Sequence, residues 1–196
     1  MVSCKPTSTI ITSKIEAEKR GIYTKPETKV NTTKKVSQTN LESTKTEKKV
    51  IRFSEFKREN TDFDYLDLGE FSDQLVQTAT NNIGSPYKTG GTTQSGFDCS
   101  GLMYSTFKNY NITLPRTSNE MSRYGRTIDR NEIKKGDLIF FKTLGSKVVN
   151  HVGMVVEIND EEIKFVHSSI KKGVIISSTQ EDYYKKTFSH VNRVLE

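Results

Sequence analysis

The chain has 196 residues, of which 33% are hydrophobic and 28% charged, enough for one domain with a packed core and an additional polar segment. No apolar run approaches the roughly 20 residues that a membrane-spanning helix needs. The net charge of +6 comes from residues 1–60, where 14 Lys or Arg outnumber 7 Asp or Glu, whereas residues 61–196 hold 16 and 17. This distribution lacks the basic face of a nucleic-acid-binding domain, so no nucleic-acid partner is expected.

The first third of the chain is predicted to be a disordered basic linker, over residues 1–61. Thr, Ser, Lys, Glu and Asn dominate it, and only 13 of its first 50 residues are hydrophobic. Such a segment buries too little apolar surface to offset the entropy of ordering it, apart from a weakly supported short helix around residues 15–20. We interpret the segment as a solvated spacer. The alternative is a tether whose lysines contact an anionic surface.

A domain over residues 62–196 is predicted to begin with an amphipathic helix that packs on the core. Its apolar side chains recur every four residues: Phe71, Leu75, Ala79 and Ile83. Gly84 provides a C-terminal stop. A loop rich in Gly, Thr and Ser follows, and a second helix is predicted to begin at Cys99 and to end near residues 109–111.

The remainder of the domain is predicted to be one short helix followed by a sheet. Residues 117–120 have the form of a capping box that opens a helix to about Tyr124. Segments rich in Val, Ile and Phe predict strands over residues 137–142, 152–157, 163–167 and 174–177, with a hairpin turn at 159–160 and a closing strand over 189–195. Helices first and an antiparallel sheet afterwards indicate an α+β domain.

Cys99 is the candidate nucleophile because it falls in the first turn of a predicted helix. There, unpaired backbone N–H groups and the helix dipole stabilise a thiolate. A thiol that attacks an amide also needs an imidazole base and a third polar group that orients the imidazole. His151 and His167 stand at the start and the end of two strands joined by a predicted turn, so antiparallel pairing would bring them together. The alternative for Cys99 is a small buried hydrophobic residue.

Five short motifs, in this order and spacing, resemble the NlpC-type cell-wall cysteine peptidases of the papain-like clan. They are Pro-Tyr-Lys-Thr-Gly-Gly (86–91), Phe-Asp-Cys-Ser-Gly-Leu (97–102), Leu-Pro-Arg-Thr-Ser (114–118), Lys-Gly-Asp-Leu-Ile-Phe-Phe (135–141) and His-Val-Gly-Met (151–154). The resemblance covers roughly residues 70–196. It implies a papain-like fold, with N-terminal helices packed on a mostly antiparallel sheet, in which Cys99, His151 and His167 are catalytic.

The resemblance also implies how the tetrahedral intermediate is stabilised. The Tyr87 hydroxyl would donate to the oxyanion beside the backbone N–H of Cys99. Asp98 fits an N-cap carboxylate, with substrate contact as the lesser alternative, and Ser100 would contact substrate. We interpret His190 as a surface strand residue. The spacing of the histidines and cysteines predicts no metal site, and no cofactor is expected.

The activity implied by the resemblance is that of a peptidoglycan hydrolase, a cysteine endopeptidase that cuts an amide bond in a cell-wall stem peptide. The bond between γ-D-glutamate and the diamino acid is favoured, and the cross-link between two stems is a second candidate. An acyltransferase or amidase on the same fold and a non-catalytic wall-binding domain are the alternatives. The intact set of Cys99, His151 and His167 argues against the last of these.

Cys4 raises the question of a membrane anchor. A small residue directly precedes it and a polar stretch follows, which is similar to the end of a bacterial lipoprotein signal whose charged and apolar parts are not in this sequence. Either Cys4 is unmodified, or it is the lipid-bearing residue of a longer precursor. The expected location is the bacterial cell envelope, secreted or lipid-anchored. A flexible chain of about 60 residues would give an anchored enzyme a reach of roughly 40–45 Å.

Overall fold

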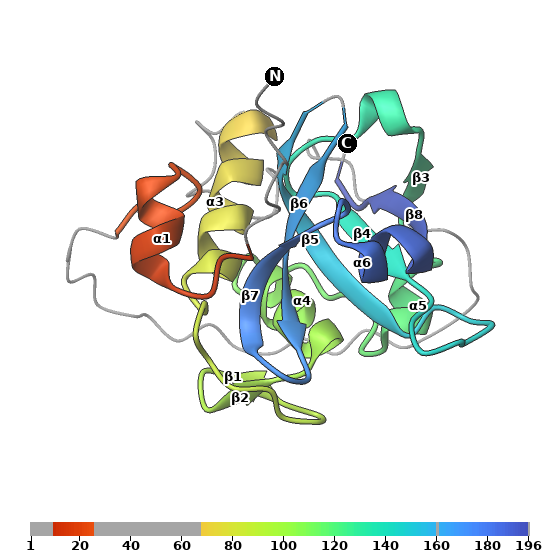
Figure 1. Ribbon diagram of the computed structural model, residues 1–196, viewed down its shortest axis with the longest axis horizontal. Helices are drawn as coiled ribbons and strands as arrows, with labels where there is room; N and C mark the ends of the chain where they lie inside the picture. Colours follow the sequence, from red (N-terminus) through yellow and green to blue (C-terminus); the bar gives the residue numbers. More distant parts are fainter. Residues whose placement is uncertain (1–9, 26–67, 160, 196) are drawn as a thin grey trace, which may run out of the picture.

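The structure, a computed structural model, describes residues 10–25, 68–159 and 161–195 (Figure 1). Its helices are α1 (Lys14–Lys19), α3 (Leu68–Thr80), α4 (Cys99–Lys108), α5 (Ser118–Met121) and α6 (Asp182–Thr187), with a 3-10 turn over Arg130–Glu132. Its strands are β1 (Thr92–Thr93), β2 (Gly96–Phe97), β3 (Arg126–Ile128), β4 (Leu138–Phe141), β5 (His151–Ile158), β6 (Ile163–Ser169), β7 (Gly173–Ser178) and β8 (Phe188–Arg193). Among these residues, no helix is both long and apolar enough to cross a membrane.

Six strands form the main sheet, in the order β3-β8-β4-β5-β6-β7, and every neighbouring pair is antiparallel. β4 and β5 lie at its centre, while β3 and β7 are its outer strands. The predicted α+β class, with helices packed on a mostly antiparallel sheet, is confirmed. The predicted strands also appear in the sheet with small changes of boundary, because their alternate side chains are buried on both faces.

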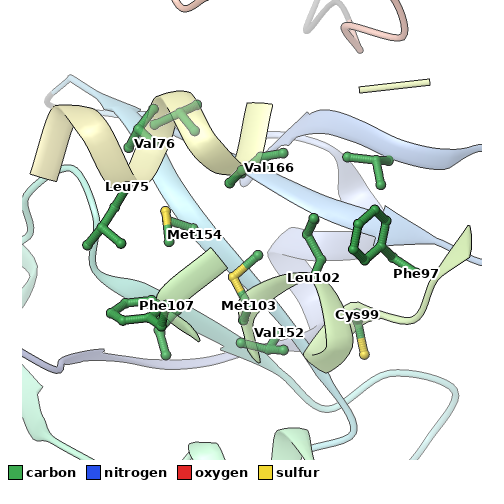
Figure 2. Close-up of a cluster of buried hydrophobic side chains, with 14 of the residues drawn as sticks. Leu75, Val76, Phe97, Cys99, Leu102, Met103, Phe107, Val152, Met154 and Val166 are labelled. Carbon is green, nitrogen blue, oxygen red and sulfur yellow. The ribbon is translucent and has the colours of Figure 1, made fainter. Parts of the chain in front are cut away.

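Two hydrophobic cores lie on opposite faces of this sheet. The larger one joins α3 and α4 to side chains that include Phe140, Val152 and Met154. Figure 2 shows its side chains from Leu75 and Phe107 to Phe97, with Cys99 at one end of the cluster. The smaller core, on the other face, joins Tyr184 of α6 to the alternate residues of the same strands, among them Phe141 and Phe165. The sheet is therefore buried on both sides, and α6 covers the face opposite α4.

The helices begin and end close to their predicted positions. α3 covers Leu68–Thr80, so Ile83 lies in the turn that follows, where it is still buried in the core. Gly84 adopts φ 90°, as expected of a residue that follows a helix. The capping box at Thr117 and Glu120 is present and opens α5, which ends at Met121 and not near Tyr124.

The prediction of a disordered linker over residues 1–61 is corrected for the segment 10–25, which we call the N-terminal strap. Ile11 exchanges two backbone hydrogen bonds with Ile176, of 3.0 and 2.9 Å, and so adds a bridge to the outer strand β7. At the other end of the strap, the side-chain amide of Gln77 on α3 donates to the carbonyl oxygen of Thr24 at 2.7 Å and accepts from its N–H at 3.1 Å. α1 lies between these contacts, beside α3 (Figure 1).

The strap is ordered because its few apolar residues reach the main core. Ile11 and Ala17 are fully buried and Tyr23 is 7% exposed. Composition concealed this, since three buried side chains among many polar ones do not change the average of a long window. The predicted helix around 15–20 corresponds to α1, whose N-cap is Ser13. The other residues of the predicted linker, and Cys4 with them, lie outside the described ranges.

Candidate functional site

Cys99 is the first residue of α4, as predicted. Asp98 is the N-cap, and its carboxylate accepts a hydrogen bond from the N–H of Gly101 at 2.6 Å, which confirms the predicted capping role. The loop before the helix packs closely on this turn: a Cβ at Gly101 would lie 2.0 Å from the carbonyl oxygen of Gly91. Only a glycine permits that approach, which holds the loop against the nucleophile's turn.

The thiol of Cys99 lies beside the first residues of β5. Its Sγ is 4.0 Å from the carbonyl oxygen of Asn150, the residue before His151. Burial raises the pKa of the thiol and outweighs the backbone N–H groups of Val152, Ser100 and Cys99 itself, which lower it. The helix terminus therefore acts in the predicted direction, but the resting thiol is protonated at neutral pH.

His151 and His167 make direct contact, as the predicted strand pairing required. The Nε2 atom of His151 lies 2.9 Å from the Nδ1 atom of His167. The contact leaves Nδ1 as the ring nitrogen of His151 that can serve as the base. Because Cys99 Sγ lies next to the backbone on either side of His151, and Nδ1 is the ring nitrogen nearer the backbone, Nδ1 is on the side of the thiol.

Both histidines are held in their neutral form. His167 is fully buried. His151 keeps some exposure, but its ring lies against Phe141 and Tyr184, and burial lowers its pKa to about 4. Burial also lowers the pKa of His167, and the neighbouring His151 lowers it further. With a protonated thiol and two neutral imidazoles, the site rests without an ion pair, so the proton must move when the thiol attacks.

Gly153 allows the close approach of the strand that carries His167. A Cβ at this position would lie 2.8 Å from Cδ2 of Phe165, 2.8 Å from the carbonyl oxygen of Val166 and 3.2 Å from Cβ of His167. Any larger residue would push β6 away from β5 and separate the two histidines. The glycine of the 151–154 motif thus has a structural reason in this chain.

Tyr87 lies near the thiol. A backbone bridge holds it to Phe97, two residues before Cys99. Burial raises the pKa of Tyr87, and the negative charges that Cys99 and Asp98 can carry raise it further, which places the phenol within electrostatic reach of both. The phenol therefore stays protonated and remains a hydrogen-bond donor.

Asp98 and Ser100 belong to one polar cluster with Arg116, a residue that sequence reasoning missed. The guanidinium of Arg116 donates to both carboxylate oxygens of Asp98, at 3.0 and 2.7 Å, and to Oγ of Ser100 at 3.0 Å. Gly90 N–H also donates to Asp98, at 2.8 Å. The hydrogen bond from Arg116 and those from the backbone hold the pKa of Asp98 below its usual value despite burial, so the carboxylate is charged.

The third histidine is not part of this cluster. His190 stacks on Phe140, and its Nε2 lies 3.0 Å from the carbonyl oxygen of Ser122 at the end of α5. It is half-buried, so the predicted surface role is corrected to a structural one. No group of three metal-ligating side chains occurs among the described residues.

Two further residues were missed: Ser177 of β7 and Tyr184 of α6, both in contact with His167. A serine in a buried strand has no distinguishing signal. The segment that became α6 showed no clear pattern, because only one of its six residues is buried. Arg116 did stand in a recognised motif, but only the fold shows that it reaches Asp98.

A thiol at the start of a helix, packed on an antiparallel sheet that carries a histidine pair, is the arrangement of the papain-like cysteine peptidases. Residues 84–193 match the NlpC/P60 family, and the chain belongs to that family. The expectation from the five motifs is confirmed.

The chain is similar to several curated proteins over its second half. It is 40% identical over 114 residues to a probable endopeptidase NlpC homolog of Haemophilus influenzae, covering 58% of this chain and 57% of that one. It is 38% identical to the murein DD-endopeptidase MepS/murein LD-carboxypeptidase of Escherichia coli K12, with 57% of each covered. It is 42% identical over 86 residues to a γ-D-glutamyl-L-lysine dipeptidyl-peptidase of Bacillus cereus, with 43% and 26% covered.

The match accounts for only part of these relatives, 57% of the first of them. Among solved structures, an NlpC/P60 family protein from Bacillus cereus has a TM-score of 0.57 and 35% identity, covering 64% of this chain and 40% of that one. These likenesses agree with the architecture of the sheet and its helices. They leave the N-terminal strap outside the region matched by the family.

Proposed function

We propose that the chain is a peptidoglycan hydrolase, a cysteine endopeptidase that cuts an amide bond in cell-wall stem peptides. The observation that carries the proposal is the contact between His151 and His167 beside the thiol of Cys99. The names of the relatives support it, since they are endopeptidases, a murein carboxypeptidase and a dipeptidyl-peptidase. The site has the nucleophile, base and orienting group that acyl transfer requires.

In the first step, the thiol of Cys99 attacks the carbonyl carbon as Nδ1 of His151 takes its proton. His167 accepts a hydrogen bond from Nε2 of His151 and stabilises the imidazolium that forms. The oxyanion is held by the backbone N–H of Cys99 and the hydroxyl of Tyr87. The imidazolium then protonates the departing amine, which leaves a thioester on Cys99. A water molecule, deprotonated by His151, hydrolyses the thioester and releases the acid.

The cluster of Asp98, Ser100 and Arg116 frames the nucleophile. Asp98 is fully engaged by its hydrogen bonds and ion pair, so its main work is to hold the first turn of α4 and the preceding loop. Ser100 stays our candidate for substrate contact, with Asp98 as the lesser one. Arg116 keeps 37% of its side chain exposed beside them.

The bond that is cut divides the relatives themselves. The names from Escherichia coli refer to a DD-endopeptidase and an LD-carboxypeptidase, whereas the name from Bacillus cereus refers to a γ-D-glutamyl-L-lysine bond. We keep the γ-D-glutamyl–diamino acid bond as the favoured site and the cross-link as the second. Both occur in defined muropeptides, so one experiment separates them.

The test incubates the purified full-length protein with a monomeric muropeptide and with a cross-linked dimer, followed by mass spectrometry. Hydrolysis yields two fragments whose masses together exceed that of the substrate by one water, and their identity names the bond. An acyltransferase would instead join the acyl part to an acceptor amine without adding water. Binding of both substrates without any change of mass would indicate a wall-binding domain. The Cys99→Ala variant is the control and should yield no product.

We further propose that the protein works in the cell envelope, with Cys4 as a candidate lipid anchor. The N-terminal strap changes what such an anchor would do. From Cys4 to Ile10 the chain can span at most about 20 Å, since an extended residue covers roughly 3.5 Å. Because residue 11 is bonded to β7, an anchored domain would stay near the membrane and would not search over the predicted 40–45 Å.

The anchor is tested by the intact mass of the protein isolated from its native envelope. A lipid-modified Cys4 adds the mass of several acyl chains, since a single chain holds a protein only marginally. In that case Cys4→Ser should release the protein from membranes without changing its activity on soluble muropeptides. An unmodified Cys4 would refute the anchor and leave a secreted enzyme.

A further inference from the structure

The hydrogen-bonded chain of the site does not end at His167. The Nε2 atom of His167 lies 3.1 Å from Oγ of Ser177 and 3.2 Å from the hydroxyl of Tyr184. Ser177 is 2% exposed and Tyr184 is 8% exposed, so both hydroxyls are shielded from water. Two elements, β7 and α6, therefore each aim a buried hydroxyl at the ring nitrogen of His167 that faces away from His151.

The reaction requires one particular tautomer in each histidine. If Nδ1 of His151 is to take the proton of the thiol, the neutral ring must carry its own proton on Nε2. That N–H then donates to Nδ1 of His167, which has to be unprotonated. His167 in turn carries its proton on Nε2, and this proton needs an acceptor inside a buried pocket.

The opposite arrangement would disable the base. With its proton on Nδ1, His167 would donate to Nε2 of His151, and His151 would then carry its proton on Nδ1. A ring protonated there cannot accept the proton of the thiol. The two tautomer pairs share the same heavy-atom positions, so the choice between them depends on what Nε2 of His167 meets.

We propose that Ser177 and Tyr184 are positioning residues that hold the His167–His151 pair in the tautomer that makes His151 a base. Their hydroxyl oxygens accept the Nε2 proton of His167, for which the buried pocket otherwise offers no partner among the described residues. The inference rests on the proposed cysteine-hydrolase function, but its main readout does not need a substrate.

The packing around Tyr184 keeps its hydroxyl in place. Its ring lies 5.2 Å from that of Phe141, 5.0 Å from that of Phe165 and 5.3 Å from that of His167, edge to face in each case. Ser177 also hydrogen-bonds to Tyr184, so the two hydroxyls and Nε2 of His167 form a closed group. Burial raises the pKa of Tyr184, and the phenol stays neutral at any pH at which the protein is folded.

The experiment uses the full-length protein and the variants Tyr184→Phe, Ser177→Ala and the double variant. Each change removes a hydroxyl and keeps most of the side-chain volume. Tyr183→Phe is the matched control, because Tyr183 precedes Tyr184 on α6 but is 46% exposed. The chain has three histidines, so ¹⁵N-labelling of histidine gives spectra in which each ring can be assigned and its protonated nitrogen identified. His190 serves as the internal reference.

In the wild type we expect His151 and His167 both to be protonated at Nε2. In the double variant the His167 proton should move, at least in part, to Nδ1. Alkylation of Cys99 by iodoacetamide at neutral pH, and kcat on a muropeptide that is cut, should fall about tenfold in each single variant and about a hundredfold in the double, with KM unchanged. Tyr183→Phe should match the wild type in every measurement.

Three results would overturn the proposal: wild-type His167 protonated at Nδ1, a double variant with the wild-type tautomer, or a changed tautomer with unchanged alkylation. A fall in kcat without a change of tautomer belongs to the second case and assigns the hydroxyls another role. If no muropeptide is cut by the wild type, the proposed function fails, yet the spectra and the alkylation rates still decide this inference.

Discussion

The Nε2 atom of His151 lies 2.9 Å from the Nδ1 atom of His167, and this contact decides which nitrogen of His151 is left for the thiol of Cys99. It joins the first residue of β5 to a fully buried residue of β6. It also requires Gly153, since a side chain there would force the two strands apart.

The histidines should differ in what they contribute to turnover. His151→Ala should lower kcat by at least about a thousandfold, as much as the loss of Cys99, because base and nucleophile act as a unit. His167→Ala should cost about ten- to a hundredfold, since water can partly replace an orienting group. Steady-state kinetics on a muropeptide that is cut provides the measurement.

His190→Ala is the control for these variants. It should leave kcat near that of the wild type but lower the free energy of unfolding by about 1 kcal/mol, because a hydrogen bond to the end of α5 and a stack on Phe140 are lost. If His190→Ala were the most damaging of the three for kcat, the assignment of the base would be wrong.

Tyr87→Phe should lower kcat about a hundredfold with little change in KM, the usual effect of removing one oxyanion donor. The hydroxyl acts only when the carbonyl oxygen becomes charged, so substrate binding should persist. An unchanged kcat would return Tyr87 to the role of a packed aromatic ring.

The buried histidines should make the protein less stable in mild acid. Their pKa values are lowered, that of His151 to about 4, so below about pH 6.5 the unfolded chain binds protons that the folded protein does not. The free energy of unfolding should therefore be constant above about pH 7 and fall, as pH decreases from 6.5 towards 4, by up to about 1.4 kcal/mol per pH unit for each histidine. Urea unfolding at a series of pH values measures this slope, and His151→Asn should reduce it. A flat profile between pH 7 and 4.5 would contradict the burial of neutral histidines.

The N-terminal strap should contribute to the stability of the whole domain. Ile11 is fully buried, so Ile11→Ala should lower the free energy of unfolding by about 3 kcal/mol. Ile15, on α1 of the same strap, is 68% exposed, and Ile15→Ala should have almost no effect. Urea unfolding of the two full-length variants is the test. Equal stabilities would mean that the strap opens independently and that the domain does not depend on it.

The contrast between the strap and the catalytic strands shows what the sequence can predict. β5 and β6 are dense in Val, Ile and Phe, so their pairing, and with it the meeting of His151 and His167, followed from local pattern. Ile11 and Ala17 lie among polar residues, and only their partners, Ile176 of β7 and the main core, distinguish them from a spacer. Ser177 and Tyr184 escaped for a related reason: their role depends on long-range contact with His167, which no local period encodes.

The pKa of Cys99 illustrates a second limit. The start of a helix predicts a stabilised thiolate, and the backbone N–H groups do lower the pKa, but burial in the end of the core outweighs them. Burial is a property of the folded chain and could not be estimated from a loop and a helix start. The nucleophile was identified correctly from the sequence, whereas its resting protonation state was not.

The central claim, an acyl-enzyme on Cys99, is tested most directly by trapping it. The full-length protein is mixed with a muropeptide that it cuts, quenched in acid within its first turnover and analysed by intact mass and peptide mapping. We expect an added mass equal to the acyl part of the substrate on the peptide that contains Cys99, lost on treatment with hydroxylamine and absent from Cys99→Ala. Cleavage of the muropeptide by Cys99→Ala at the wild-type rate, or an acyl group found on another residue, would contradict the account.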